Sequence, residues 1–119
     1  MFMKYVASVA LTALACGMLS TTADAQRAEP RRIEQCSLII AGDQFIEGPC
    51  DFTMLDDDGS FQIMSTDGLF FAQVIVTAPG EGMGYWNEDA GANHAHSPLG
   101  QLSRDGACWS TPELEVCAR

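Results

Sequence analysis

The chain has 119 residues, of which 16 are acidic and six are Lys or Arg, and its formal net charge at pH 7 is −10. Its length fits a single domain. Because nucleic-acid binding requires a basic surface, this charge excludes nucleic acid as an expected partner, and it also disfavours anionic membrane surfaces.

The first 25 residues have the order of a secretory signal peptide. Lys4 supplies a positive charge, an uncharged apolar run follows at residues 5–19, and residues 23–25 form an A-x-A cleavage pattern. The apolar run is shorter than the roughly 20 residues that a membrane-spanning helix needs. We therefore predict cleavage after Ala25, no membrane span, and export to the periplasm or the extracellular space.

A second processing route is open at Cys16. The sequence Leu14-Ala15-Cys16-Gly17 resembles the end of a bacterial lipobox. Processing there would attach acyl chains to Cys16, so the protein would be anchored to a membrane instead of being released.

Residues 26–35 are charged, contain Pro30 and show no apolar periodicity, which predicts a flexible leader before a single domain at residues 36–119. Short strands are expected at residues 37–41 and 44–47, about a Gly42-Asp43 turn. A three-strand meander follows at residues 51–55, 60–65 and 69–78, with Asp58-Gly59 and Asp67-Gly68 in its turns.

The two turns of the meander predict one shared apolar face. With Asp58-Gly59 as the loop, Met54 faces Ile63; with Asp67-Gly68 as the loop, Ile63 faces Ala72 and Phe61 faces Val74. The members of this face are Phe52, Met54, Phe61, Ile63, Phe70 and Val74.

The stretch at residues 80–96 is rich in glycine and predicts one long loop or several short ones, a feature that is uncommon unless functional. Three further short strands are expected at residues 99–103, 107–110 and 114–117. Together these segments predict an all-β domain, either a small antiparallel barrel or a curled sheet of five to seven strands.

Four cysteines remain after the predicted cleavage, which is typical of an exported domain with two disulfides. If Pro112-Glu113 is a turn, Cys108 faces Cys117. In the first hairpin Cys36 faces Pro49, which is adjacent to Cys50. This geometry favours Cys36–Cys50 and Cys108–Cys117, while the two other pairings, which would join the chain ends, stay open.

Two groups in the glycine-rich stretch are candidate sites. The first comprises Tyr85, Trp86, Asn87, Glu88 and Asp89, where an aromatic pair beside polar groups could stack on a sugar or anchor a protein partner. The alternative is that Trp86 is a lid over one open end of the sheet.

The second group is His94-Ala95-His96. On an extended chain residues i and i+2 point the same way, so both imidazoles could reach one metal ion, zinc or copper in preference to hard cations. The alternative is a pair of surface histidines, and our first expectation is that the protein has no cofactor.

No nucleophile motif surrounds the serines, so we do not expect an enzyme. In size and class the chain resembles the bacterial periplasmic inhibitors of c-type lysozyme, but their Ser-Gly-x-x-Tyr motif does not occur here, so the resemblance assigns no residue. We predict a small acidic exported protein of binding or inhibitor type, with residues 82–96 facing a cationic protein or a glycan. The alternative is a metal-binding envelope protein that uses His94 and His96.

Overall fold

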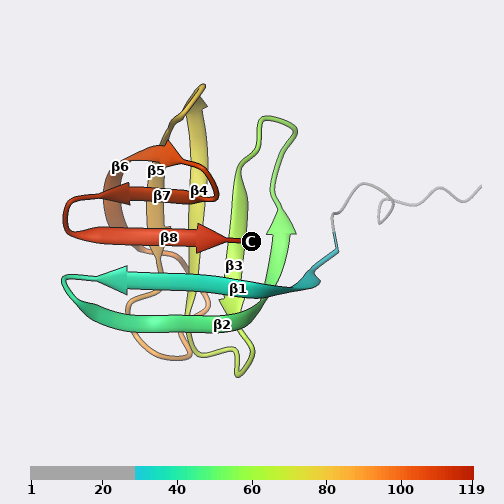
Figure 1. Cartoon of the computed structure of the whole chain (residues 1–119). Helices are drawn as coiled ribbons and strands as arrows, with labels where there is room; N and C mark the ends of the chain where they lie inside the picture. Colours follow the sequence, from blue (N-terminus) through green and yellow to red (C-terminus); the bar gives the residue numbers. More distant parts are fainter. Residues whose placement is uncertain (1–28) are drawn as a thin grey trace, which may run out of the picture.

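The computed structural model describes residues 29–119, which form a closed antiparallel β-barrel (Figure 1). The predicted signal peptide and the possible lipid attachment at Cys16 lie outside the described residues. In chain order the strands are β1 (Arg31–Ile40), β2 (Asp43–Met54), β3 (Phe61–Ser65), β4 (Phe71–Ala78), β5 (Glu81–Trp86), β6 (Ser97–Asp105), β7 (Cys108–Thr111) and β8 (Leu114–Ala118). The all-β prediction is confirmed, but the barrel has eight strands instead of five to seven.

Each strand pairs with the next, and β8 returns to pair with β1, so the barrel has no free sheet edge. In Figure 1, β1, β7 and β8 run horizontally, while β3 and β4 run vertically. The 12-residue β2 bends from one direction to the other. Among residues 29–119 there is no helix long and apolar enough to cross a membrane.

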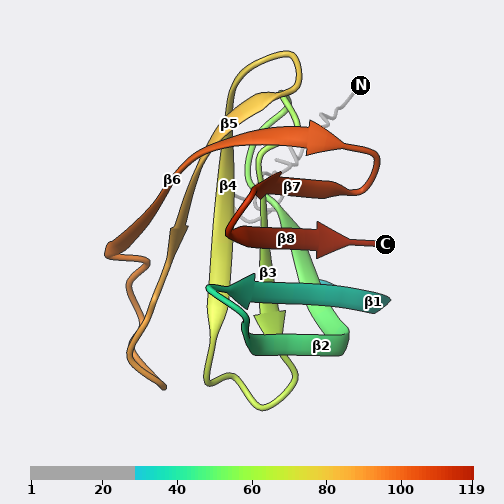
Figure 2. The same cartoon turned by 60° about the vertical axis from the view of Figure 1, so that its left-hand side comes forward.

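Antiparallel pairing sorts the connections between two ends of the barrel. The β1–β2, β3–β4, β5–β6 and β7–β8 connections lie at one end, which we call the loop end. The β2–β3, β4–β5 and β6–β7 connections and both ends of the described chain lie at the other, which we call the terminal end (Figures 1 and 2). The space between is filled by fully buried side chains: Leu38, Ile63, Val74, Leu102 and Val116.

β5 is the strand that the sequence did not predict, because its glycines resemble a loop. Gly82 and Gly84 are buried inside the barrel wall. A Cβ atom on Gly84 would lie 2.8 Å from Cδ1 of Leu102, and one on Gly82 would lie 3.3 Å from Cζ3 of Trp109. The glycines therefore leave room for large core side chains, and the predicted loop at residues 80–96 shortens to the connection after Trp86.

β1 begins at Arg31, so residues 31–35 belong to the barrel and not to a flexible leader. The Nε atom of Arg32 lies 3.0 Å from Oδ1 of Asp51 on β2, and Ile33 packs against the core. The sequence did not predict this half of the strand because it is charged. Its pairing depends on a residue of the neighbouring strand, Asp51, which is distant in sequence.

The meander registers are confirmed at one turn and wrong at the other. Ile63 pairs with Ala72 and Phe61 pairs with Val74, as predicted. Ile63 pairs with Phe52 instead of Met54, because the β2–β3 loop is wider than a two-residue turn. A shift of two residues keeps the same face inward, so most of the predicted apolar face is core, although Met54 is 40 % exposed.

Both predicted disulfides are present, Cys36–Cys50 and Cys108–Cys117. Cys108 and Cys117 are paired directly across β7 and β8, as the turn predicted. Cys36 pairs with Gly48, and the bridge to Cys50 spans a register shift between β1 and β2. The first turn is also one residue earlier than expected, since Ile40 pairs with Asp43.

Candidate functional site

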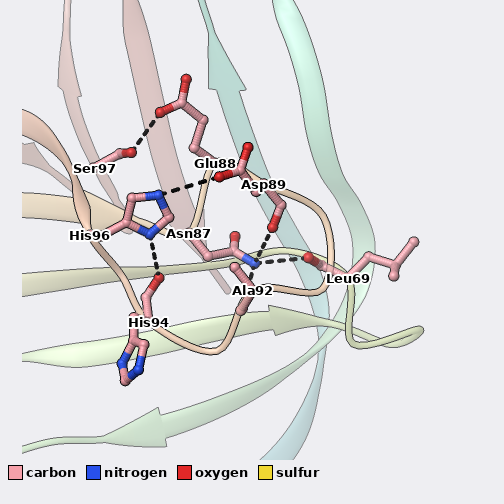
Figure 3. A network of polar contacts seen from close by, with 8 residues as sticks. All are labelled: Leu69, Asn87, Glu88, Asp89, Ala92, His94, His96 and Ser97. Carbon is pink, nitrogen blue, oxygen red and sulfur yellow. Dashed lines mark hydrogen bonds and ion pairs between the residues drawn. The ribbon is translucent and has the colours of Figure 1, made fainter.

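The β5–β6 connection, residues 87–96, is fixed to the barrel by the fully buried side chain of Asn87 (Figure 3). Its Oδ1 accepts a hydrogen bond from the backbone N–H of Phe71 at 3.1 Å. Its Nδ2 donates to the carbonyl oxygens of Leu69 at 2.9 Å, Ala92 at 3.0 Å and Asp89 at 3.3 Å. One amide therefore joins the loop to the β3–β4 turn.

Trp86 closes the barrel beneath this loop. It is buried, and its ring centroid lies 4.7 Å from that of Phe45 and 6.1 Å from that of Phe70. These contacts agree with the alternative prediction for Trp86, in which its ring covers one open end of the sheet. The side chains of Trp86 and Asn87 complete the interior of the loop end instead of standing out from it, so they do not supply the exposed surface that the predicted binding group requires.

The three other members of the predicted binding group lie in different places. Tyr85 is half-buried on the outer wall of the barrel, where it pairs with Gln73 and Pro98. Glu88 and Asp89 are exposed on the loop, and Oε1 of Glu88 accepts a hydrogen bond from Oγ of Ser97 at 2.6 Å. The predicted group therefore does not form one surface.

The two histidines do not converge on one point. Nδ1 of His96 lies 3.0 Å from the carbonyl oxygen of His94, and Nε2 of His96 lies 3.6 Å from Oδ2 of Asp89. The ring of His94 points away from this contact (Figure 3). Both side chains are exposed, so the geometry favours surface histidines over a two-imidazole metal site.

Among residues 29–119, one group of three possible metal ligands comes together, formed by Cys108, Glu115 and Cys117. Both of its sulfur atoms belong to a disulfide, so they are not available as thiolates. This group therefore gives no support to a metal centre.

A groove of about 560 Å³ lies beside the loop, over the outer faces of β3 and β4. The residues that line it include Gln62, Met64, Phe71, Gln73, Asn93 and His94. Nε2 of Gln73 donates a hydrogen bond to Oε1 of Gln62 at 2.9 Å. The predicted register, with Ile63 opposite Ala72 and Phe61 opposite Val74, implies that Gln62 lies opposite Gln73. The sequence predicted a loop at residues 80–96 but not its position beside β3 and β4.

The two ends of the barrel differ in whether their carboxylates are accompanied by arginines. The exposed carboxylates of the loop end, which we call the acidic rim, are Asp43, Asp67, Glu88, Asp89 and Glu113. No Lys or Arg lies among the connections of this end. The four arginines of the described chain, Arg31, Arg32, Arg104 and Arg119, lie at the terminal end, together with the exposed carboxylates Asp56, Asp57, Asp58, Glu81 and Asp105. Comparison with protein-family models, curated proteins and solved structures finds no match to this chain.

One carboxylate of the rim is held in its charged form by the β3–β4 turn. The backbone N–H of Leu69 and the hydroxyl of Ser65 donate hydrogen bonds to Asp67, at 3.0 and 2.7 Å, and these bonds lower the pKa of its carboxyl. Asp67 therefore stays ionised at a pH where a free aspartate begins to protonate.

This lowered pKa predicts a contribution to acid sensitivity. A carboxyl with a pKa lower in the folded state than in the unfolded state stabilises the fold above the unfolded value, and the contribution disappears as pH falls through the folded value. Asp67→Asn retains an acceptor but cannot ionise. We therefore expect its free energy of unfolding, measured with urea, to fall less than that of the wild type between about pH 5 and pH 2. Asp57→Asn is the control, since the backbone N–H groups of its turn donate to the carboxylate of Asp56 and not to that of Asp57. Equal acid profiles for wild type and Asp67→Asn would contradict the argument.

Proposed function

We propose that this chain is an exported, non-enzymatic binding protein that recognises a cationic protein or peptide through the acidic rim and the adjoining groove. The observation that carries the proposal is the acidic rim itself, five exposed carboxylates on connections that hold no Lys or Arg, whereas the carboxylates of the terminal end lie beside all four described arginines. Export is supported by the two disulfides, which persist in oxidising compartments.

The rim favours a cationic partner because its charges add at long range. Carboxylates on neighbouring connections produce a negative potential that extends about 10 Å into solvent at 0.1 M salt. Such a field raises the association rate of an oppositely charged partner, while the arginines at the far end favour an orientation with the rim leading. The rim thus supplies rate and orientation more than affinity.

The groove supplies contacts that a field alone cannot. The amides of Gln62 and Gln73 offer donors and acceptors, and Met64 and Phe71 offer apolar surface beside them. A peptide segment crossing the groove could satisfy both kinds of group at once. A glycan could also use the amides, but its binding would be insensitive to the charge of the rim.

Two comparisons test this proposal: binding at low and high salt, and removal of charge at one end of the barrel or the other. We expect c-type lysozyme and an arginine-rich peptide, used as basic probes, to bind with an association rate that falls about tenfold or more between low salt and 0.3 M salt, as measured by surface plasmon resonance. The rim variant Glu88→Gln/Asp89→Asn/Glu113→Gln should show a similar loss at low salt.

The matched control removes the same number of charges at the terminal end, with Asp57→Asn/Asp58→Asn/Asp105→Asn. It should retain most of the wild-type association rate, because the altered groups lie away from the rim. Failure of both probes to bind at low salt, or equal losses in the two triple variants, would overturn the proposal.

A further inference from the structure

The terminal end of the barrel has a hollow of its own, at the opposite end from the acidic rim. Its volume is about 240 Å³, and the side chains that line it include Phe52, Met54, Phe61, Arg104 and Trp109. The mouth of a β-barrel is a common place for a small-molecule site.

The lining of this mouth is aromatic. The rings of Phe52 and Phe61 are stacked, with centroids 5.5 Å apart, and Trp109 closes the floor with only 5 % of its surface exposed. Met54 and Leu55, two of the three exposed large apolar residues of the described chain, stand at the β2–β3 connection beside it. An apolar ring or chain entering the mouth would cover this surface.

Two arginines take inward-facing positions at the same mouth. Arg31 is paired with Phe52 and Arg104 with Trp109, so each shares the inner face with an aromatic residue. The guanidinium carbons lie 5.1 Å and 5.9 Å from the centroids of those rings. Cationic groups are thus held directly over the apolar lining.

Neither arginine is neutralised within residues 29–119. The ion pairs of this part of the chain are Arg32 with Asp51 and His96 with Asp89. The Nε of Arg104 donates to the carbonyl oxygen of Gly106 at 2.9 Å, which orients the guanidinium and leaves its terminal nitrogens without a partner in the same residues.

The carboxylates nearest this mouth do not pair with Arg104, although Asp57 and Asp58 also stand on the β2–β3 connection at this end. Asp105 follows Arg104 on the strand and so occupies the opposite, outer face. The Oδ1 of Asp56 accepts hydrogen bonds from the backbone N–H groups of Asp58 and Ser60 within its own loop. The charged side chain that lines the hollow itself is Arg104.

We propose that this mouth binds a small amphipathic carboxylate, with its ring or short alkyl chain against Phe52, Phe61 and Trp109 and its carboxylate on Arg104. The hollow is smaller than the 300–1,000 Å³ typical of sites for drug-sized ligands, which limits the apolar part to one ring or a short chain. In a protein of net charge −10 an anion is repelled elsewhere, so the local arginines select for it. The site is independent of the proposed function at the other end.

The two tryptophans provide a test, because Trp109 reports on the mouth and Trp86 on the loop end. Octanoate, octanamide and octylammonium are titrated into the ¹⁵N-labelled protein below their micellar concentrations. We expect octanoate to shift the indole signal of Trp109 and not that of Trp86, with saturation, and to bind about tenfold more tightly than octanamide, which lacks the charge. Octylammonium should bind most weakly.

Arg104→Gln should weaken octanoate binding about tenfold and leave octanamide binding unchanged. Arg32→Gln changes the net charge equally but removes an arginine that is paired with Asp51 outside the mouth, so it should retain octanoate binding. Thermal unfolding confirms that both variants fold. No saturable shift of Trp109 by octanoate, equal affinity for the three probes, or equal losses in the two variants would each overturn the proposal.

Discussion

Replacing Cys36 and Cys50 together by alanine is expected to lower the free energy of unfolding by about 3 kcal/mol or more. The bridge closes a loop of sequence separation 14, for which the loss of unfolded-chain entropy alone corresponds to about 3 kcal/mol. Both residues are buried in the core, so the variant also loses packing. Because small domains are stable by only about 5–15 kcal/mol, this is a large fraction of the total.

Urea unfolding under oxidising conditions measures this loss, and the second bridge supplies the comparison. Cys108→Ala/Cys117→Ala opens a loop of separation 9, so we expect about 2–3 kcal/mol and a smaller loss than for the first pair. A larger loss at the second bridge would show that chain entropy and burial do not govern the two contributions.

The disulfides could be predicted from the sequence because a bridge tolerates small errors of register. Pro112-Glu113 is the actual turn between β7 and β8, which places Cys108 opposite Cys117. The first hairpin was predicted one residue out of place, and a register shift separates Ile33 from Cys36. The Cα atoms of Cys36 and Cys50 still lie 6.0 Å apart, within the usual range for a disulfide.

β5 could not be predicted because its signal is a tertiary one. Gly82 and Gly84 weaken a strand pattern locally, and only the positions of Leu102 and Trp109 explain why no side chain fits there. The omission had a further consequence. Without β5 the connections after it are assigned to the wrong ends of the barrel, since the ends alternate from strand to strand.

The acidic rim was hidden for the same reason. The sequence establishes the net charge, but the grouping of Asp43, Asp67 and Glu113 with the β5–β6 loop depends on the closure of the sheet and the number of strands. Likewise Arg31 and Arg104, which are distant in sequence, lie at one mouth because β1 begins and β6 ends at the terminal end of the barrel. Patterns local to a hairpin were predictable, and arrangements that require the whole barrel were not.

Asn87→Ala is expected to destabilise the protein by about 2–4 kcal/mol and to release the β5–β6 loop. The substitution leaves the backbone N–H of Phe71 and the carbonyl oxygen of Ala92 without their partner, while the carbonyl oxygen of Leu69 keeps the hydrogen bond from Gly91. Each buried group left unpaired costs about 1–3 kcal/mol. Water entering a loosened loop offsets part of this cost. Urea unfolding measures the stability, with Asn93→Ala in the exposed part of the loop as the control.

Hydrogen exchange separates a local effect from a global one. Gly91 donates its backbone N–H to the carbonyl oxygen of Leu69 at 2.8 Å, so its amide should exchange faster in Asn87→Ala than the reduction in global stability accounts for. Amides of β7 and β8 should change only by the global amount. Because the same loop carries Glu88 and Asp89 and walls the groove, binding of a basic probe should weaken in Asn87→Ala even where the protein remains folded. Unchanged exchange at Gly91 would mean that contacts other than the buried amide of Asn87 hold the loop. The positions of Glu88 and Asp89 in the rim would then not depend on Asn87.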